Sequence, residues 1–133
     1  MWSYKLFRIG ALILGLNGIA FYLDRSANIA AKPVNGTEYQ LRDLLYGFKF
    51  NAMGTMRTHG DIYDGLNLSF SVFMLTLAAI GLLTPVNRKT AYVICGSLAA
   101  MIAVSLTYWF LMPTAFMAVG LVCYAGSAYL DKK

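Results

Sequence analysis

The chain has 133 residues, of which 59% are Ala, Val, Ile, Leu, Met, Phe, Trp, Tyr or Cys and only 13% are charged. A soluble domain averages about 45–50% apolar and about 25% charged residues, so this chain lacks the polar groups that a water-exposed surface needs. These proportions exclude a soluble enzyme, a disordered tail and a disulfide-linked scaffold as first interpretations. They predict an integral membrane protein that forms a single domain over residues 1–133.

Four apolar segments lie between the clusters of charged residues. They cover about residues 6–23, 65–84, 90–112 and 113–130, and a long loop, 24–60, follows the first of them. A helix needs roughly 17–25 residues to cross the hydrocarbon, and each segment is about that long. Helices satisfy their own backbone groups in lipid, and the segments lack the alternation of barrel strands. The sequence therefore predicts an all-α integral membrane protein with a four-transmembrane-helix bundle.

The first segment also has features of a cleaved signal peptide. Lys5 and Arg8 lie at its start, and small residues follow it at Ala27, Ala30 and Ala31. Cleaved signals end in small residues of this kind. The apolar core is rather long for a signal, so we expect a retained membrane span.

The distribution of Lys and Arg predicts the orientation of the spans, because cytoplasmic loops carry an excess of these residues. With the N-terminus inside, the net charge of +5 falls wholly on the inner side and the residues between the first two spans sum to zero. We therefore expect both termini in the cytoplasm and the 24–60 loop outside. The inner Lys and Arg residues are Lys5, Arg8, Arg88, Lys89, Lys132 and Lys133, against Asp131.

Small residues form a stripe along the third segment. Ala91, Cys95, Ala99, Ala103 and Thr107 recur every four residues. Helices in lipid associate through close packing of such residues. The stripe predicts tight contact within the chain, in a homo-oligomer or with other membrane subunits. The first and fourth segments add Gly10, Gly15, Gly18, Gly120, Ala125 and Gly126.

The loop between the first two spans contains a candidate short helix. A turn-forming run at residues 33–36 precedes Thr37, which together with Gln40 matches a capping box. We therefore predict a helix from Glu38 to about residue 48. Its apolar residues fall on one broad face, which predicts an amphipathic helix that lies on the membrane surface or caps the bundle. They are Leu41, Leu44, Leu45 and Phe48.

The densest polar run covers residues 56–67 and leads into the second span. If the second helix begins within this run, Asp64, Asn67 and Ser71 share one face, because they are three and four residues apart. Asp61 would start the same helix, where a carboxylate stabilises the positive end of the helix dipole.

Two interpretations of this run stay open. In the structural one, Asp61 caps the helix and Asp64 pairs with Arg57 or Arg42. In the functional one, the run lines a polar pocket, because polar groups at membrane depth are costly and often mark function. Its candidate catalytic residues are Asp64, Asp61 and His59, since a histidine beside carboxylates can shuttle protons. Its candidate ligand-binding residues are Arg57, Arg42, Glu38, Asn67 and Tyr63.

A metal site is a weaker hypothesis for the same run. His59, Asp61 and Asp64 could supply three ligands, but their spacing matches no established metal motif. Cys95 and Cys123 lie inside spans and have no metal or redox spacing. We expect neither a metal nor a cofactor.

Two stretches of the sequence resemble a known family. The first span begins Phe7-Arg8-Ile9-Gly10, and the polar run Arg57–Asn67 continues into residues 68–73. Both are similar to small four-span bacterial membrane proteins of the DoxX-like kind. The resemblance implies a four-helix bundle in a bacterial inner membrane. Some relatives are accessory subunits of quinone-linked oxidoreductases, but the sequence has no haem, iron–sulfur or flavin motif, and no catalytic residue carries over.

Three functions follow as hypotheses. The first is a non-catalytic accessory subunit or apolar-ligand-binding bundle that contacts membrane lipid, other subunits or a second copy, and no nucleic acid. The alternative is a small membrane enzyme that acts on a lipid or isoprenoid by acid–base chemistry at the entry of the second span. A transporter ranks last, because the spans hold no acidic residue near mid-membrane and no inverted repeat is evident.

Overall fold

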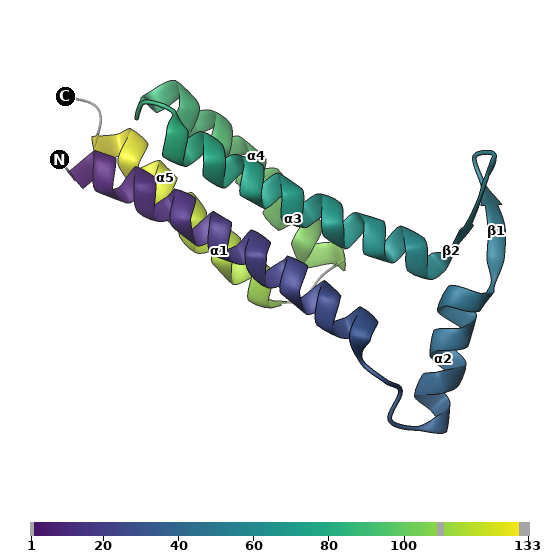
Figure 1. The fold of residues 1–133 in the computed structure, drawn as a ribbon. Coiled ribbons are helices and arrows are strands. Elements are labelled where there is room, and N and C mark those ends of the chain that lie inside the picture. Colours follow the sequence, from purple (N-terminus) through teal and green to yellow (C-terminus); the bar gives the residue numbers. More distant parts are fainter. Residues whose placement is uncertain (1, 109–110, 131–133) are drawn as a thin grey trace. The chain divides into compact units, whose positions relative to one another are not determined.

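The computed structural model describes residues 2–108 and 111–130. Within them the chain forms five helices and two strands (Figure 1). In chain order these are α1 (Trp2–Ala30), α2 (Gly36–Gly47), β1 (Lys49–Ala52), β2 (Thr55–Thr58), α3 (His59–Leu83), α4 (Arg88–Tyr108) and α5 (Leu111–Leu130). Lys132, Lys133 and Asp131, which entered the charge count, lie outside the described residues.

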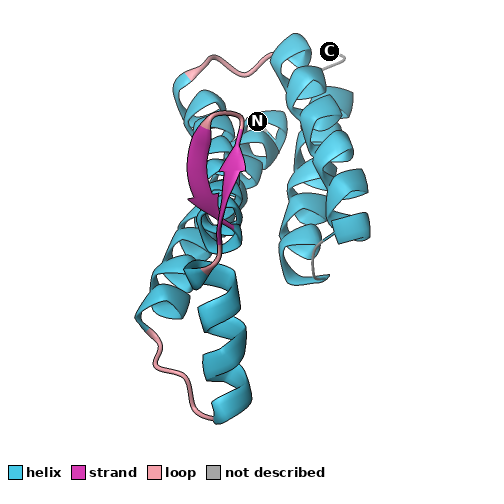
Figure 2. Cartoon of the chain, turned by 90° about the vertical axis from the view of Figure 1, so that its right-hand side faces the viewer, coloured by secondary structure: helices cyan, strands magenta, loops and turns pink. Residues whose placement is uncertain are grey.

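Four of the helices, α1, α3, α4 and α5, are long and apolar enough to cross a membrane. The stretches that meet this criterion are Trp2–Ala27, His59–Leu83, Arg88–Leu106 and Pro113–Leu130. The prediction of four apolar helices is therefore confirmed, and a multi-pass membrane protein follows from them. The sequence analysis did not predict β1 and β2, which form an antiparallel hairpin (Figure 2).

The predicted ends of the spans differ from the observed ones. The first helix continues past residue 23 to Ala30, because no Pro or Gly interrupts it before Pro33, which disfavours helix in the residue before it. The second helix begins at His59 instead of residue 65. α4 ends at Tyr108 and α5 begins at Leu111, so Pro113 lies inside the first turn of α5, where its missing N–H needs no partner.

The chain forms two compact units, which are described separately here. The bundle unit comprises Met1–Ile19 and Val72–Lys133, and the linking unit comprises Ala20–Ser71. The linking unit takes its name from the chain order, because it joins the first part of α1 to the last part of α3. Its own elements are the end of α1, α2, the hairpin and the start of α3.

The core of the bundle unit is built from all four of its helices. Its largest fully buried side chains include Phe7 of α1, Met74 of α3, Leu98 of α4 and Tyr124 of α5. The rings of Phe7 and Tyr124 meet edge to face with 4.9 Å between their centroids. Such a pair adds about 0.5–1.5 kcal/mol beyond the area that it buries.

Close helix contact within the chain is confirmed at Gly10. A Cβ atom on this glycine would lie 3.0 Å from the ring of Tyr124 and 3.2 Å from the Cβ of Cys123. The small-residue stripe on α4, by contrast, is only partly buried. Ala91 is buried and Cys95 half-buried, whereas Ala99 is exposed.

Arg8 fixes the end of α3 within the bundle unit. Its Nη1 donates to the backbone oxygen of Gly81 at 2.7 Å and also to that of Leu82. The last four carbonyls of a helix have no intrahelical partner, and a cation there also stabilises the negative end of the dipole. A basic residue of α1 thus completes the last turn of α3.

The linking unit begins its own helix, α2, with a cap that differs from the predicted one. Asn35 is the N-cap, and its Oδ1 accepts from the backbone N–H of Glu38 at 2.9 Å. The Glu38 carboxylate accepts in turn from the N–H of Val34 at 2.6 Å. The predicted capping box of Thr37 and Gln40 is therefore wrong, because asparagine at the preceding turn is an equally strong N-cap.

The hairpin is the element that the sequence analysis missed. Its strands are joined by Met53 and Gly54, whose φ angles are 51° and 86°. Two positive φ angles are the requirement of a type I′ turn, whose twist matches that of the strands. The side chain of Asn51 accepts from the N–H of Gly54 at 2.7 Å and supports the turn. Thr58 ends β2, and α3 begins at the next residue.

Candidate functional site

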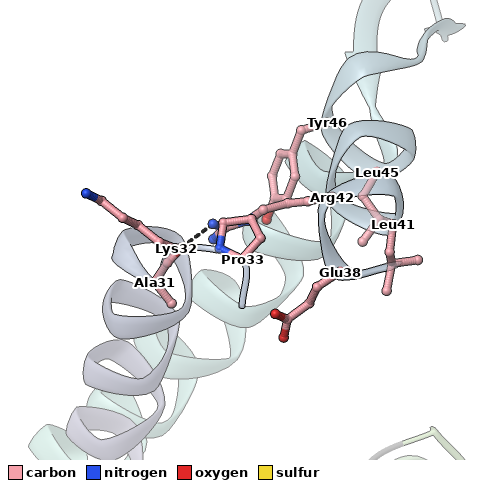
Figure 3. Close-up of a pocket in the computed structure, with 8 residues that line it drawn as sticks. All are labelled: Ala31, Lys32, Pro33, Glu38, Leu41, Arg42, Leu45 and Tyr46. Carbon is pink, nitrogen blue, oxygen red and sulfur yellow. Dashed lines mark hydrogen bonds between the residues drawn. The ribbon is translucent and has the colours of Figure 1, made fainter. Parts of the chain in front are cut away.

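A hollow in the linking unit lies between residues 31–33 and one face of α2 (Figure 3). Its volume is about 230 Å³. The α2 residues that line it are three and four apart, so a single helical face forms one wall. The complete lining is Ala31, Lys32, Pro33, Glu38, Leu41, Arg42, Leu45 and Tyr46.

Arg42 crosses this hollow and reaches the end of α1. Its Nη1 donates to the backbone oxygen of Ala31, the residue that follows α1, as the dashed line in Figure 3 shows. Arg42 thus gives a partner to a carbonyl at the end of a helix, where intrahelical donors are lacking. Glu38 also lines the hollow, and its carboxylate is bonded to Val34. Both predicted ligand-binding residues therefore have structural hydrogen bonds as well.

A second hollow, of about 390 Å³, adjoins the first in the linking unit. The two share Pro33, Arg42 and Tyr46, and the second adds Tyr39, Asp43 and Gly47. Arg42 and Tyr46, both on α2, therefore border both hollows.

Tyr46 connects α2 to the start of α3. A Cβ atom on Gly60 would lie 2.2 Å from a carbon of the Tyr46 ring, so only glycine allows the ring to lie there. The Tyr46 hydroxyl donates to Oδ2 of Asp64 at 3.3 Å. Burial, followed by the negative charge of Asp64, raises the pKa of the Tyr46 phenol above its ordinary value. At neutral pH the phenol therefore stays a neutral donor.

Asp61 belongs to a reciprocal cap at the start of α3. Its backbone N–H donates to Oγ1 of Thr58 at 3.0 Å, and its carboxylate accepts from the Thr58 N–H at 2.9 Å. This is the geometry of a capping box, in which two helix-end donors are satisfied together. The prediction that Asp61 starts the second helix is confirmed, and its carboxylate is committed to this cap.

His59 and Arg57 lie on the hairpin side of α3. The His59 ring packs on the ring of Phe50 with 4.7 Å between centroids. Arg57 is exposed on β2 and pairs across the hairpin with Phe50. Neither residue lines the two hollows described above.

The polar face predicted for α3 is confirmed by its burial. Asp64 and Asn67 are half-buried and Ser71 is fully buried, on the same face as buried Gly60. Tyr63 is exposed. Within the linking unit, the buried part of α3 thus carries these polar side chains together with the buried ring of Phe70.

The candidate residues do not converge on one cavity. Glu38 and Arg42 line the first hollow, whereas Asp64 reaches it only through its hydrogen bond to Tyr46. Asp61 and His59 have other partners, Thr58 and Phe50. Among the described residues no three His, Cys, Asp or Glu side chains gather in a way that could hold a metal ion. His59, Asp61 and Asp64 therefore do not form a three-ligand cluster in the part of the chain that the structure describes.

Two side chains of the hollow that carry polar groups, Tyr46 and Lys32, were absent from the predicted site. Tyr46 lies eight residues after Glu38 and four after Arg42, so helical spacing alone would have placed it on their face. Lys32 carries no such signal, because its place beside α2 depends on how the chain turns at Pro33.

No protein-family description, curated protein or solved structure matches the chain. The DoxX-like resemblance therefore stays a prediction.

Proposed function

We propose that the protein is a non-catalytic accessory subunit of the membrane, which presents helix surfaces to a partner and carries out no chemistry itself. The observation that carries this proposal is that four of its ionisable side chains hydrogen-bond to the backbone at helix ends. Asp61 and Glu38 begin helices, and Arg8 and Arg42 complete helix ends. Acid–base catalysis needs groups within hydrogen-bond reach of a bound substrate, whereas these groups are bonded to the backbone.

The face that would receive a partner lies on α4. Gly96, Ala99 and Ala100 are exposed there, and a Cβ atom on Gly96 would meet nothing within 4 Å. Small residues let two helix backbones approach closely in lipid, where apolar burial alone gives no driving force. A second copy of the chain or a helix of another membrane subunit fits this face equally well.

The location belongs to the same proposal. A bacterial inner membrane with both termini in the cytoplasm is supported by the DoxX-like resemblance and by the count of Lys and Arg near the span ends. Attaching a reporter that is active on one side of the membrane after residue 53, in the hairpin turn, and after residue 86 tests the orientation. Activity of both fusions on the same side would contradict it.

The accessory role is tested by extracting the protein gently from its own membranes and measuring the mass of the complex by light scattering. We expect a mass above that of one chain. Gly96→Leu should reduce it to one chain, because the leucine blocks the close approach of another helix while its Cβ meets nothing within 4 Å in its own chain. Gly65→Leu is the matched control, since Gly65 is also exposed on a helix with nothing within 4 Å of its Cβ position. Equal masses for the two variants would contradict the proposal.

The alternative of an enzyme acting on a lipid or isoprenoid has one supporting observation. Tyr46 both lines the hollow and donates to Asp64, so a phenol and a carboxylate lie together at its edge. Comparing the lipids of cells that carry the wild type with those that carry Asp64→Asn tests it. A lipid that accumulates only with Asp64→Asn would favour the enzyme over the accessory subunit.

A further inference from the structure

We propose that the basic end of the bundle unit, formed by Lys5, Arg8, Arg88 and Lys89, binds phospholipids whose headgroups carry a net negative charge. The proposal does not depend on the accessory role, because it concerns the lipids around the bundle unit and no second protein. It names the class of lipid that this end would select from the membrane.

Three structural links bring the four cations to the same end of the bundle unit. Near the end of α5, Oγ of Ser127 donates to the backbone oxygen of Ser3 at the start of α1, at 2.9 Å. Arg8 of α1 donates to the backbone at the end of α3. Only residues 84–87 separate α3 from α4, which begins with Arg88. The start of α1, the end of α5 and the turn between α3 and α4 therefore lie at one end of the bundle unit (Figure 1).

The described part of the bundle unit holds no acidic side chain that could neutralise the basic end. Its residues 2–19, 72–108 and 111–130 have the four cations as their only charged side chains. By sequence, Asp131 follows α5 and is itself followed by two lysines, so the whole bundle unit has a net charge of +5. The linking unit has equal numbers of basic and acidic residues. The excess positive charge thus belongs to the bundle unit and attracts an anion.

Three of the four cations lie over an aromatic ring. The pairs, with the distance from Nζ or Cζ to the ring centroid, are Lys5 and Trp2 at 5.2 Å, Arg8 and Tyr4 at 5.0 Å, and Arg88 and Tyr92 at 5.6 Å. All three rings are more than half exposed. Exposed Trp and Tyr near the end of a span lie at the level of the lipid headgroups. The rings place the cations at this level and leave their charge in place, because a cation–π contact neutralises nothing.

An exposed apolar stripe on α1 continues from the basic end into the span. Ile9, Leu12 and Leu16 follow Lys5 at spacings of four, three and four residues, so the four side chains share one helical face. The three apolar side chains are 46%, 55% and 61% exposed. A phospholipid presents the same order, with a charged headgroup followed by acyl chains. The stripe therefore favours a lipid over a free anion.

The test uses the full-length protein, delipidated in detergent and then titrated with phosphatidylglycerol or with phosphatidylcholine of the same acyl chains. Both lipids carry a phosphate, but only phosphatidylglycerol has a net charge. Native mass spectrometry counts the lipids bound at each concentration. We expect phosphatidylglycerol to bind more tightly, and its advantage to shrink as salt is added, because salt screens exposed charges. Equal affinities for the two lipids would overturn the proposal.

The double variant Lys5→Gln, Lys89→Gln tests the basic end directly. Both side chains are exposed, so the substitutions leave the buried core of the bundle unit unchanged. They should weaken the binding of phosphatidylglycerol about 30-fold, since each basic residue near an anionic membrane surface contributes about 1 kcal/mol. The matched control is the double variant Lys32→Gln, Lys49→Gln, which removes the same charge from exposed residues of the linking unit. It should bind phosphatidylglycerol as the wild type does.

Two further results would count against the basic end as a lipid site. Equal losses of affinity in the two double variants would overturn the proposal, because binding would then follow the total charge of the protein. Displacement of phosphatidylglycerol by millimolar inorganic phosphate would also overturn it, because the basic end would then select free phosphate. None of these results bears on the mass of the complex, so the accessory role is tested separately.

Discussion

The hydroxyl oxygen of Tyr124 lies 2.2 Å from the position that a Cβ atom on Gly81 would occupy. The methyl group of Ala11 would lie 2.7 Å from the same position. At Gly81, α1, α3 and α5 therefore lie in close contact in the bundle unit. Tyr124 is fully buried, and its hydroxyl has no hydrogen-bond partner among the residues that the structure describes.

Gly81→Ala should destabilise the protein by about 1–3 kcal/mol, the usual cost of overpacking a close-packed core. Gly65→Ala is the control, because a Cβ atom on this glycine of α3 would meet nothing within 4 Å. It should stabilise the chain by up to about 1 kcal/mol, since alanine is the better helix former. Unfolding in detergent, followed by circular dichroism, measures both changes. Equal effects of the two substitutions would show that Gly81 is not a tight contact.

Tyr124→Phe should stabilise the bundle by about 1 kcal/mol, because it removes a buried hydroxyl that lacks a partner. The same substitution should restore much of the stability lost in Gly81→Ala, since it removes the atom nearest to the new methyl group. The double variant, unfolded under the same conditions, checks this coupling. Simple additivity of the two single effects would contradict it.

Arg8→Gln should destabilise the bundle unit by about 2 kcal/mol, because hydrogen bonds from a charged donor contribute about 1.5–3 kcal/mol. Its target is the backbone of Gly81 and Leu82, so hydrogen exchange should rise in the last turn of α3. Arg8→Lys should lie between the wild type and Arg8→Gln, since it keeps the charge without the planar fork. A lysine variant as unstable as the glutamine variant would rule out a contribution from charge.

Thr58→Ala should cost about 1 kcal/mol, the typical loss when a helix N-cap is removed. Hydrogen exchange at the Asp61 amide, which donates to Thr58, should increase most. Thr55→Ala on the same strand is exposed and should leave this amide protected. Asp61→Ala combined with Thr58→Ala should cost less than the sum of the two, because each residue caps the other. Protection that persists in Thr58→Ala would contradict the capping role.

Alkaline pH should break the contact between Tyr46 and Asp64. The raised pKa of the Tyr46 phenol means that the folded state holds this proton more tightly than the unfolded state does. The resulting stabilisation is complete below the ordinary tyrosine pKa of about 10, and it is lost as the pH rises through the raised value. Fluorotyrosine at position 46, observed by fluorine NMR, reports this titration.

Asp64→Asn serves as the comparison for that titration. It removes the negative charge but leaves the burial of Tyr46, which is the larger cause of the shift. The pKa of the Tyr46 phenol should therefore fall toward its ordinary value without reaching it. An unchanged pKa in Asp64→Asn would show that the carboxylate does not act on the phenol.

The helices could be predicted from the sequence because their signal is local. Runs such as residues 65–84 and 90–112 have nearly the composition that lipid requires, and α3 and α4 contain most of them. The hairpin could not be predicted in the same way. Its turn has Met53 where asparagine or aspartate would have been the strong signal, and its strands have only four residues each.

The candidate site was predicted less well than the spans, for a physical reason. Periodicity identifies residues on one face of one helix, and it placed Asp64, Asn67 and Ser71 correctly. It does not show which side chain from another element meets that face. Tyr46 reaches Asp64 from α2, eighteen residues earlier, and this contact depends on the missing side chain of Gly60.

The cap that Arg42 places on the end of α1 has a consequence for the order in which the chain is built. Arg42 is eleven residues beyond Ala31, so it leaves the ribosome after all of α1. The carbonyl of Ala31 must therefore rely on water until α2 has formed. Arg8 stands in the opposite relation to α3, because it is already synthesised when Gly81 and Leu82 emerge. During synthesis, the Ala31 carbonyl therefore gains its Arg42 donor only after α1 is complete. The donor for the end of α3, Arg8, is synthesised before α3 itself.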